Sequence, residues 1–495
     1  MDFLHLQNTD SVALKDIPQL EFEHFRNVLE ELVMQRNCRI GAFFAEDGIL
    51  YAVLIDPAEH HFKVLSCKVG AAYTALTCSI PAFHWFEREL YEQSNIKPEG
   101  HPWLKPLRFE NSSMPGVTDY FTMQGSAAHE VAVGPVHAGV IEPGHFRFQC
   151  MGEDVYFLEI ELGYQHRGVE KMLVEAAPKL RTHLVETAAG DSSVAYALAF
   201  DGVISALSAQ KREKLSDRAN ILRTLALELE RIANHVGDVG ALAGDVAFLT
   251  TNAYCGRIRG DFLNMTAQLC GNRFGRNYIT YDGVAFDLAN EDLPALREWF
   301  ERTVADFKNA WHLMSDDPGV LDRLENTGTV PGETMRQIGG VGVAARAAGL
   351  DMDVRRDLGG IGVYDRLVWK VPTAPNGDVW CRARMRRMEL RESIRMVRAL
   401  LTLLENSAPE EKRAAANHPV ELHAERLAVT AVEAWRGEMV CVGISGKAGE
   451  LKRIKLVDPS FHNWFALALA LRGEQISNFP ICNKSFNLSY CGHDL

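Results

Sequence analysis

The stretch that most constrains the fold is LRTLALELERIANHVGDVGALAGDVAF, residues 222–248. Its apolar residues recur at alternating spacings of 3 and 4, which predicts one long α-helix. This apolar stripe consists of Leu222, Leu225, Leu229, Ile232, Val236 and Val239. A second stripe, about 100° around the helix, consists of Glu228, Arg231, His235, Asp238 and Asp245.

Small residues surround the polar stripe, so we expect it to face another packed element rather than water. Each glycine costs a helix about 1 kcal/mol relative to alanine, and Gly237, Gly240 and Gly244 therefore predict the close approach of a second backbone. Buried carboxylates need partners, and Arg231 and His235 are the nearest in the sequence. Such a network can relay protons or be purely structural.

Composition excludes several classes of protein. The chain has 495 residues, enough for two or three domains, and its net charge of −13 with no basic tract argues against binding to nucleic acid. No apolar run is long enough to span a bilayer, so membrane contact is expected through partner subunits. The N-terminal stretch MDFLHLQNTD has no basic segment typical of a signal peptide. Ten cysteines without a Cys-x-x-Cys pair argue against an iron–sulfur or zinc site held by this chain alone, and indicate reduced thiols.

The pattern along the chain predicts the α+β class. Residues 1–110 look like a small α+β domain, with helices over 22–35 and 82–93 and a strand pair around the Asp47-Gly48 turn. Residues 111–133 are rich in small and polar residues and are interpreted as a linker or an extended wrap. From residue 134 to 162 the pattern predicts strands and tight turns, followed by long helices that include residues 384–404.

Two further groups of residues are candidates for chemistry. His137 and His145 flank a Pro-Gly turn, where a histidine can bond or protonate a ligand near neutral pH, or simply be satisfied within a polar turn. His166, Arg167 and Glu170 lie within two helical turns and form either a buried charge network or the polar face of a helix start. The glycines of Gly359-Gly360-Ile361-Gly362 lack a βαβ context, so we find no case for nucleotide binding.

Several blocks occur together in a familiar order. They are LGYQHRGVEK, ELERIANHVGDVGALAGD, GNRFGRNY, GGVGVAARAAGLDMDVRRD and VDPSFHNWFALALALRG. With them, residues 134–495 resemble the large subunit of energy-converting [NiFe] hydrogenases of the formate-hydrogenlyase type, which is related to the 49-kDa-type subunit of complex I. FERELYEQSNI and GHPWLKPLRF resemble the 30-kDa-type subunit of complex I. The resemblance implies a fused chain: a 30-kDa-like domain over 1–110, a linker over 111–133, and a large, mainly helical domain with β-hairpins at its start.

The resemblance also implies that the metal ligands of the family are missing from this chain. The family holds nickel and iron with two Cys-x-x-Cys pairs, whose thiolates suit soft metals. Ala189 and Ser192 stand at the first cysteine pair, Tyr196 at a nearby histidine, and Ser489 and Gly492 at the second pair. Cys491 is one residue out of register, and with His493 it would need further ligands to hold a metal. The implied result is a chain that binds no metal and does not activate hydrogen.

The resemblance to complex I implies a function for a chain without the metal centre. Electrons would pass from a partner [4Fe–4S] cluster to an acceptor, with a quinone as one candidate, in the cavity lined by Ala189, Ser192, Tyr196, Ser489 and Gly492. His137 or His145 would protonate the acceptor, backed by Asp245; the alignment leaves open which histidine matches, and the family's quinone tyrosine has no clear match. Charge changes would then reach membrane subunits that translocate ions. The residues of this coupling network would be His166, Arg167, Glu170, Glu228, Arg231, His235 and Asp238.

Two alternatives compete with acceptor reduction. One is a structural and coupling scaffold with an inactive site, and the other is a working hydrogenase, which requires nickel. The partners implied by the resemblance are a small [4Fe–4S] subunit, a ferredoxin-like subunit, a membrane anchor and antiporter-like subunits. The implied location is peripheral, on the cytoplasmic face of the plasma membrane. The electron donor, the acceptor, the ion and its direction stay open.

Overall fold

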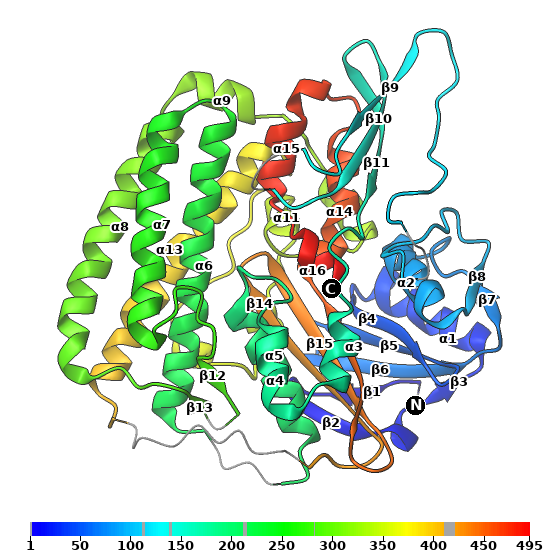
Figure 1. Ribbon diagram of the computed structural model, residues 1–495, viewed down its shortest axis with the longest axis horizontal. Helices are drawn as coiled ribbons and strands as arrows, with labels where there is room; N and C mark the ends of the chain where they lie inside the picture. The colour runs from blue at the N-terminus through cyan, green and yellow to red at the C-terminus, as the bar shows by residue number, and fades with distance from the viewer. Residues whose placement is uncertain (1, 111–113, 138–140, 211–214, 282, 410–420) are drawn as a thin grey trace.

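The computed structural model describes residues 2–110, 114–137, 141–210, 215–281, 283–409 and 421–495. The chain is of the α+β class, as predicted. Long helices stand together on one side, two larger sheets lie on the other, and short C-terminal helices lie between them (Figure 1).

The N-terminal region forms a five-stranded sheet with helices against it. Its strands are β1 (Leu4–Leu6), β3 (Gln19–Leu20), β4 (Arg39–Glu46), β5 (Ile49–Asp56) and β6 (His61–Lys68), in the order β1-β6-β5-β4 with β3 parallel to β6. Its other elements are α1 (Phe22–Glu30), the π-helical η2 (Glu31–Gln35), η3 (Pro81–Phe83), α2 (His84–Ser94) and the pair β7 (Ala72–Thr74) and β8 (Lys97–Glu99). The predicted Asp47-Gly48 hairpin is confirmed, since both residues have the positive φ (50° and 74°) that a two-residue type I′ turn requires.

A second sheet combines the two ends of the chain. Its strands are β2 (Asp10–Ala13), β14 (Arg426–Ala434), β15 (Gly437–Ser445) and β16 (Leu451–Val457), in the order β16-β15-β14-β2. Asn8 extends the pairing, because its Nδ2 donates to the Ala431 carbonyl (3.0 Å) and its Oδ1 accepts from the Ala431 N–H (2.9 Å). The regions predicted as separate domains therefore share a sheet.

Four long helices form the helical side of the molecule: α6 (Asp217–Asp245), α7 (Leu249–Cys270), α8 (Leu293–Ser315) and α13 (Val379–Glu405). Helix α6 is the predicted helix, shifted toward the N-terminus, and it begins after Ser216, whose side chain accepts from the Ala219 N–H (2.9 Å).

The glycines of α6 lie against α7, which confirms the predicted close approach. A Cβ atom added to Gly240 would lie 2.5 Å from Cys255 Cβ, and one added to Gly244 would lie 2.8 Å from the Asn252 side chain. A Cβ atom at Gly237 would meet Arg259 at 2.7 Å. Larger residues would push the two helices apart.

The remaining helices are shorter. They are α3 (Val169–Glu175), α4 (Pro178–Val185), α5 (Ser193–Leu207), α9 (Pro318–Leu324), α10 (Gly332–Gln337), α11 (Gly342–Ala347), α12 (Val354–Asp357), α14 (Pro459–Ala470), α15 (Phe479–Phe486) and α16 (Tyr490–Asp494). Other short elements are the single turns η1 (Leu14–Asp16), η4 (Asn290–Asp292), η5 (Tyr364–Arg366) and η6 (Ile476–Asn478), and the strand pair β12 (Ile279–Thr280) and β13 (Gly283–Val284). None of the helices in the described ranges has the length and apolar character needed to cross a bilayer.

A three-stranded antiparallel sheet projects at the edge of the molecule (Figure 1). It consists of β9 (Ala128–Val133), β10 (His145–Met151) and β11 (Asp154–Glu161), so the last six residues of the predicted connection form a strand. Phe146 and Phe148 of β10 pack on Phe479 of α15, with ring centroids 4.8 and 5.0 Å apart. The sheet is thereby anchored to the C-terminal helices.

Candidate functional site

The two segments predicted to match the hydrogenase ligand positions lie against each other around Asp458, the N-cap of α14. Oδ2 of Asp458 accepts a hydrogen bond from the Tyr196 hydroxyl (2.6 Å), and a Cβ atom added to Gly492 would lie 2.6 Å from the same oxygen. Burial and the Asp458 carboxylate raise the pKa of Tyr196 well above its usual value, so the phenol keeps its proton. The five predicted cavity residues, Ala189, Ser192, Tyr196, Ser489 and Gly492, are all buried. The predicted cavity residues are thus covered from solvent, and Tyr196 and Gly492 both lie directly against Asp458.

An ion pair joins the same two segments at a second point. Asp191 accepts from both terminal nitrogens of Arg436 (2.7 and 2.8 Å), and Arg436 Nε donates to the Asn487 carbonyl (2.6 Å). Burial would raise the pKa of Asp191, but Arg436 outweighs it and lowers that pKa. This arginine thus joins the start of α5 to the residues that precede α16.

This set of residues does not fit a nickel–iron centre. The Cys491 thiol lies 3.4 Å from Ser489 Oγ and close to Glu142, and burial together with Glu142 raises the pKa of the thiol to about 12. His493 has other partners, since its Nδ1 lies 2.9 Å from Asp494 Oδ1 and its ring stacks on Phe461. Across the part of the chain that the structure describes, no three His, Cys, Asp or Glu side chains gather as metal ligands.

The two hairpin histidines differ in whether both of their ring nitrogens have hydrogen-bond partners among the described residues. His145 begins β10, where its Nδ1 lies 3.4 Å from the Gly134 carbonyl and its Nε2 accepts from Arg147 Nε (3.4 Å). Burial lowers the pKa of His145, which favours the neutral ring. His137 packs on Phe146, and its buried Nε2 has no hydrogen-bond partner among the described residues. Residues 138–140, between the two histidines, lie outside the described residues.

Asp245, the third predicted member of this group, is the last residue of α6 and is exposed. Partial desolvation raises its pKa, against the opposing effect of Lys484 on α15. Helix α15 contacts both α6 and the Phe146 ring of β10, and so lies between Asp245 and the hairpin. In the described ranges, no hydrogen bond or ion pair joins Asp245 to either histidine.

Glu228 is the centre of a fully buried polar cluster. Its carboxylate accepts from Tyr364 (2.6 Å), Ser393 (2.6 Å), Arg355 (3.1 Å) and Arg231 (3.3 Å). Burial alone would raise the pKa of Glu228, but Arg231 and Arg355 lower it below its usual value. The predicted partnership with Arg231 is confirmed. The predicted partnership with His235 is wrong, because His235 Nε2 instead lies 2.9 Å from Glu389 Oε2 on α13.

Arg346 connects this histidine to a second carboxylate. Its Nε donates to Glu389 (2.9 Å) and its Nη1 to Glu433 of β14 (2.7 Å). Burial and the nearby Asp353 raise the pKa of Glu433 to about 7. For Glu389, burial is outweighed by Arg346 and His235, and its pKa lies far below the usual range. One carboxylate of this cluster therefore titrates near neutral pH while its neighbour stays ionised.

The cluster extends to the N-terminal sheet. Arg355 pairs with Asp353 (2.6 Å), whose N–H donates to Asp357 Oδ2 (3.1 Å). Asp357 then pairs with Arg39 of β4 (2.9 Å), which also pairs with Glu438 of β15 (2.8 Å). Charged side chains thus run from α6 to the sheet of the N-terminal region.

The other predicted network residues lie elsewhere. Asp238 pairs with Arg386 of α13 (2.6 Å) and accepts from the Asn487 amide. Glu170 accepts from the Lys455 ammonium (3.1 Å) and the Leu456 N–H (2.8 Å); burial opposes its ionisation, yet Lys455 and nearby arginines lower its pKa to about 2.

His166 and Arg167 contact the ends of two elements. Nδ1 of His166 lies 2.8 Å from the Asp494 carbonyl, and Arg167 donates to the carbonyls of Thr187 and Ala188 at 2.8 Å each. The seven predicted coupling residues therefore fall into three groups: Glu228, Arg231 and His235; Asp238; and His166, Arg167 and Glu170.

Comparison with known proteins identifies the chain's relatives. The family model of the respiratory-chain NADH dehydrogenase, 49 Kd subunit, matches residues 245–494, half of the 495-residue chain. The chain belongs to this family.

The relatives of this 49 Kd-family chain include hydrogenases as well as oxidoreductase subunits. It is 27% identical to the carbon monoxide-induced hydrogenase of Rhodospirillum rubrum, over 73% of this chain and 98% of that protein. It is 27% identical to an NADH-quinone oxidoreductase subunit of Thermus thermophilus, over 70% of this chain and 88% of that protein. It is 26% identical to formate hydrogenlyase subunit 5 of Escherichia coli K12, over 95% of this chain and 87% of that protein. The resemblance inferred from the sequence blocks is confirmed.

Sequence reasoning missed several residues of this 49 Kd-family site. They are Glu142, Asp458, Arg436, Arg346, Glu389 and Glu433. Asp458 and Arg346 lie inside two of the quoted blocks. Glu433 is a charged residue near the end of a strand that is mostly apolar and buried, which is a signal of a buried ion pair. Glu389 lies on α13, where regular Arg and Glu spacing is typical of a solvated face and conceals the buried side.

Proposed function

We propose that the chain is the large peripheral-arm subunit of a membrane-associated complex related to complex I and to energy-converting hydrogenases, and that it serves as a coupling subunit without a metal centre. The observation that carries this proposal is that the residues predicted at the hydrogenase ligand positions are buried and contact other protein groups. Tyr196 and Asp458 are bonded there (2.6 Å), and Gly492 lies directly against Asp458.

The proposed setting follows from the relatives' names. Subunits of NADH-quinone oxidoreductase and of formate hydrogenlyase work in assemblies, so we propose a small [4Fe–4S] subunit, a ferredoxin-like subunit, a membrane anchor and antiporter-like subunits as partners. The proposed location is the cytoplasmic face of the plasma membrane. The match to formate hydrogenlyase subunit 5 covers 95% of this chain and so includes most of residues 1–110. That supports a fusion of 30-kDa-like and 49-kDa-like parts divided near residues 111–133.

The cluster around Arg346 is the proposed transmitting element. It carries Glu433, whose pKa is about 7, beside a carboxylate held ionised. A change of charge on a nearby partner cluster would shift the protonation of such a group most easily, because its two forms have similar free energies at neutral pH. The ion pairs through Arg355, Asp353 and Arg39 would carry that change toward the N-terminal sheet.

This role is tested by the redox behaviour of the partner cluster in the purified complex. We expect its midpoint potential to depend on pH near neutrality, and Glu433→Gln to flatten that dependence while the complex still assembles. Glu298→Gln, on the exposed side of α8, is the matched control. A slope that is absent, or that is equal in Glu433→Gln, would reject the role given to Glu433. Nickel at a stoichiometric level would reject the metal-free proposal.

A second candidate function is acceptor reduction at the hairpin. The observation that favours it is the buried Nε2 of His137, which has no hydrogen-bond partner among the described residues and could bond an acceptor such as a quinone. Reduction of a quinone takes two electrons and two protons, so a donor of protons is needed beside it. The test is reoxidation of the reduced partner cluster by a soluble quinone. Acceptor reduction predicts at least a tenfold slower rate in His137→Ala, whereas the coupling role predicts no change.

A further inference from the structure

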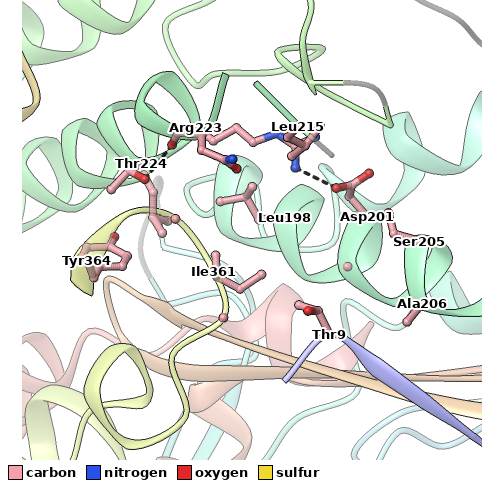
Figure 2. Close-up of a pocket in the computed structure, with 15 residues that line it drawn as sticks. Thr9, Leu198, Asp201, Ser205, Ala206, Leu215, Arg223, Thr224, Ile361 and Tyr364 are labelled. Carbon is pink, nitrogen blue, oxygen red and sulfur yellow. Dashed lines mark hydrogen bonds and ion pairs between the residues drawn. The ribbon is translucent and has the colours of Figure 1, made fainter. Parts of the chain in front are cut away.

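The glycine-rich stretch Gly359–Gly362 separates two cavities beside the buried Glu228 cluster. Gly359, Gly360 and Gly362 all have positive φ (64°, 83° and 71°), so the backbone turns sharply here. The first cavity, of about 250 Å³, lies between this stretch, α5 and α6, and Ile361 points into it (Figure 2). The second, of about 500 Å³, lies on the other side and shares Gly360, Ile361, Gly362 and Tyr364 as wall.

Three consecutive backbone donors at this wall are unused. The Gly359 N–H donates to the Val354 carbonyl (3.1 Å) and the Val363 N–H to Thr224 Oγ1 (3.2 Å). Between them, the N–H groups of Gly360, Ile361 and Gly362 donate to no acceptor within the described residues. Successive N–H groups in a turn with left-handed residues form a concave surface that attracts anions.

Cationic side chains line the second cavity. Arg355, Arg356, Lys370 and His60 are on its wall, against one acid, Asp365. Arg355 is held by Asp353 and Glu228, and Arg356 by Asp351 and Asp357.

Two donors at the rim remain available. Lys370 is exposed and makes no ion pair with any residue that the structure describes. His60 uses its Nδ1 on the Asp357 carbonyl (3.0 Å), which leaves Nε2 for a ligand. The cavity therefore offers donors and positive charge in a chain whose net charge is −13.

We propose that this second cavity is a binding site for a small oxyanion of the phosphate type. The N–H groups of Gly360, Ile361 and Gly362 would bond its oxygens, and Lys370 and His60 would close over it from the rim. Charge-assisted hydrogen bonds of this kind are stronger than neutral ones. The site stands on these contacts alone and does not depend on the proposed coupling role.

The test uses the full-length chain with inorganic phosphate and pyrophosphate as probes, followed by isothermal titration calorimetry. We expect one saturable site, weakened at least tenfold by Lys370→Glu and weakened also by His60→Asn. Both residues are exposed, so the fold should be kept, which equal melting temperatures would verify. Lys179→Glu, on the exposed face of α4, makes the same charge change elsewhere and should leave binding unchanged.

Hydrogen–deuterium exchange locates the ligand independently. Pyrophosphate should slow exchange in the peptide that contains residues 358–364, where the three unused N–H groups lie. Absence of saturable binding, equal loss in Lys179→Glu and Lys370→Glu, or protection confined to another part of the chain would overturn the proposal.

Discussion

At the scale of single residues, Asp458 links the two segments predicted to match the hydrogenase ligand positions. It is buried, caps α14 through the Ser460 N–H (2.7 Å), and accepts the Tyr196 hydroxyl. Neither Asp458 nor Tyr196 is unusual alone. Their hydrogen bond joins α5 to the start of α14, and it can be removed by deleting one oxygen atom.

Tyr196→Phe deletes that oxygen atom. We expect the free energy of unfolding to fall by about 2 kcal/mol, because a buried carboxylate oxygen loses its donor. Denaturant titration followed by circular dichroism measures the change. Tyr254→Phe, at a half-exposed position of α7, is the control and should change stability little. An unchanged stability in Tyr196→Phe would show that another donor reaches Asp458.

Glu161, at the end of β11, should give stability a measurable pH dependence. Burial raises its pKa from 4.5 to about 7, and Arg88 and Lys105 offset only part of that effect. Between these two pH values the folded chain keeps a proton that the unfolded chain has released, so this residue lowers stability as pH rises through the window.

Glu161→Gln should therefore raise the free energy of unfolding at about pH 8, by up to about 3 kcal/mol, and change it little at about pH 4.5. The measurement is denaturant unfolding at both pH values. Glu298→Gln, an exposed position, should show no such difference. An equal gain at both pH values would mean that packing rather than ionisation is responsible.

At the scale of elements, the sequence pattern predicted helices, whose formation depends on residues close together in the chain. The apolar period of residues 222–248 predicted α6 and its glycine contact with α7. The helix begins earlier, at Asp217, after the cap Ser216. The prediction missed this first turn because its residues are polar and carry no apolar period. The partner of β2 could not be predicted, since β14 is far away in the sequence. The contacts of this site were missed for the same reason: Asp458 and Arg436 reach Tyr196 and Asp191 only in the folded chain.

The start of α11 packs directly on the turn between β14 and β15. Gly342 has φ of 62°, and a Cβ atom there would lie 2.0 Å from the Arg436 carbonyl oxygen. Gly342→Ala should therefore destabilise the chain by about 3 kcal/mol or more. Gly256, in the middle of α7, has nothing within 4 Å of an added Cβ atom, and Gly256→Ala should stabilise by about 1 kcal/mol. Denaturant midpoints of the two variants should move in opposite directions; a shared direction would contradict the close contact.

At the scale of the whole molecule, buried charge joins parts that the chain order separates. Arg39 reaches Asp357 and Glu438, and Lys455 joins Glu170 to Glu89 of α2. The N-terminal sheet is thus tied to the rest by ion pairs in addition to β2. Rearrangement of one region should change the stability of the other.

Arg346→Met tests the buried charge cluster that joins α11, α13 and β14. It leaves Glu389 and Glu433 buried without their shared cation, at a cost of about 3–5 kcal/mol. The loss should be larger at about pH 8 than at about pH 5.5, because protonation of the two carboxyl groups relieves the repulsion at the lower pH. Arg336→Met removes an exposed pair with Glu333 and should cost little at either pH. A loss independent of pH would mean that side-chain packing, and not charge, is what Arg346 provides.

The placement of β2 has a consequence for how the protein is made. Arg426 bonds to Ser11, 415 positions earlier in the chain. At a translation rate of about 5–20 residues per second, β2 emerges from the ribosome roughly 20–80 s before β14, the strand it pairs with. During that interval its edge is open to other chains or to chaperones, so this sheet is completed only after β14 has been synthesised.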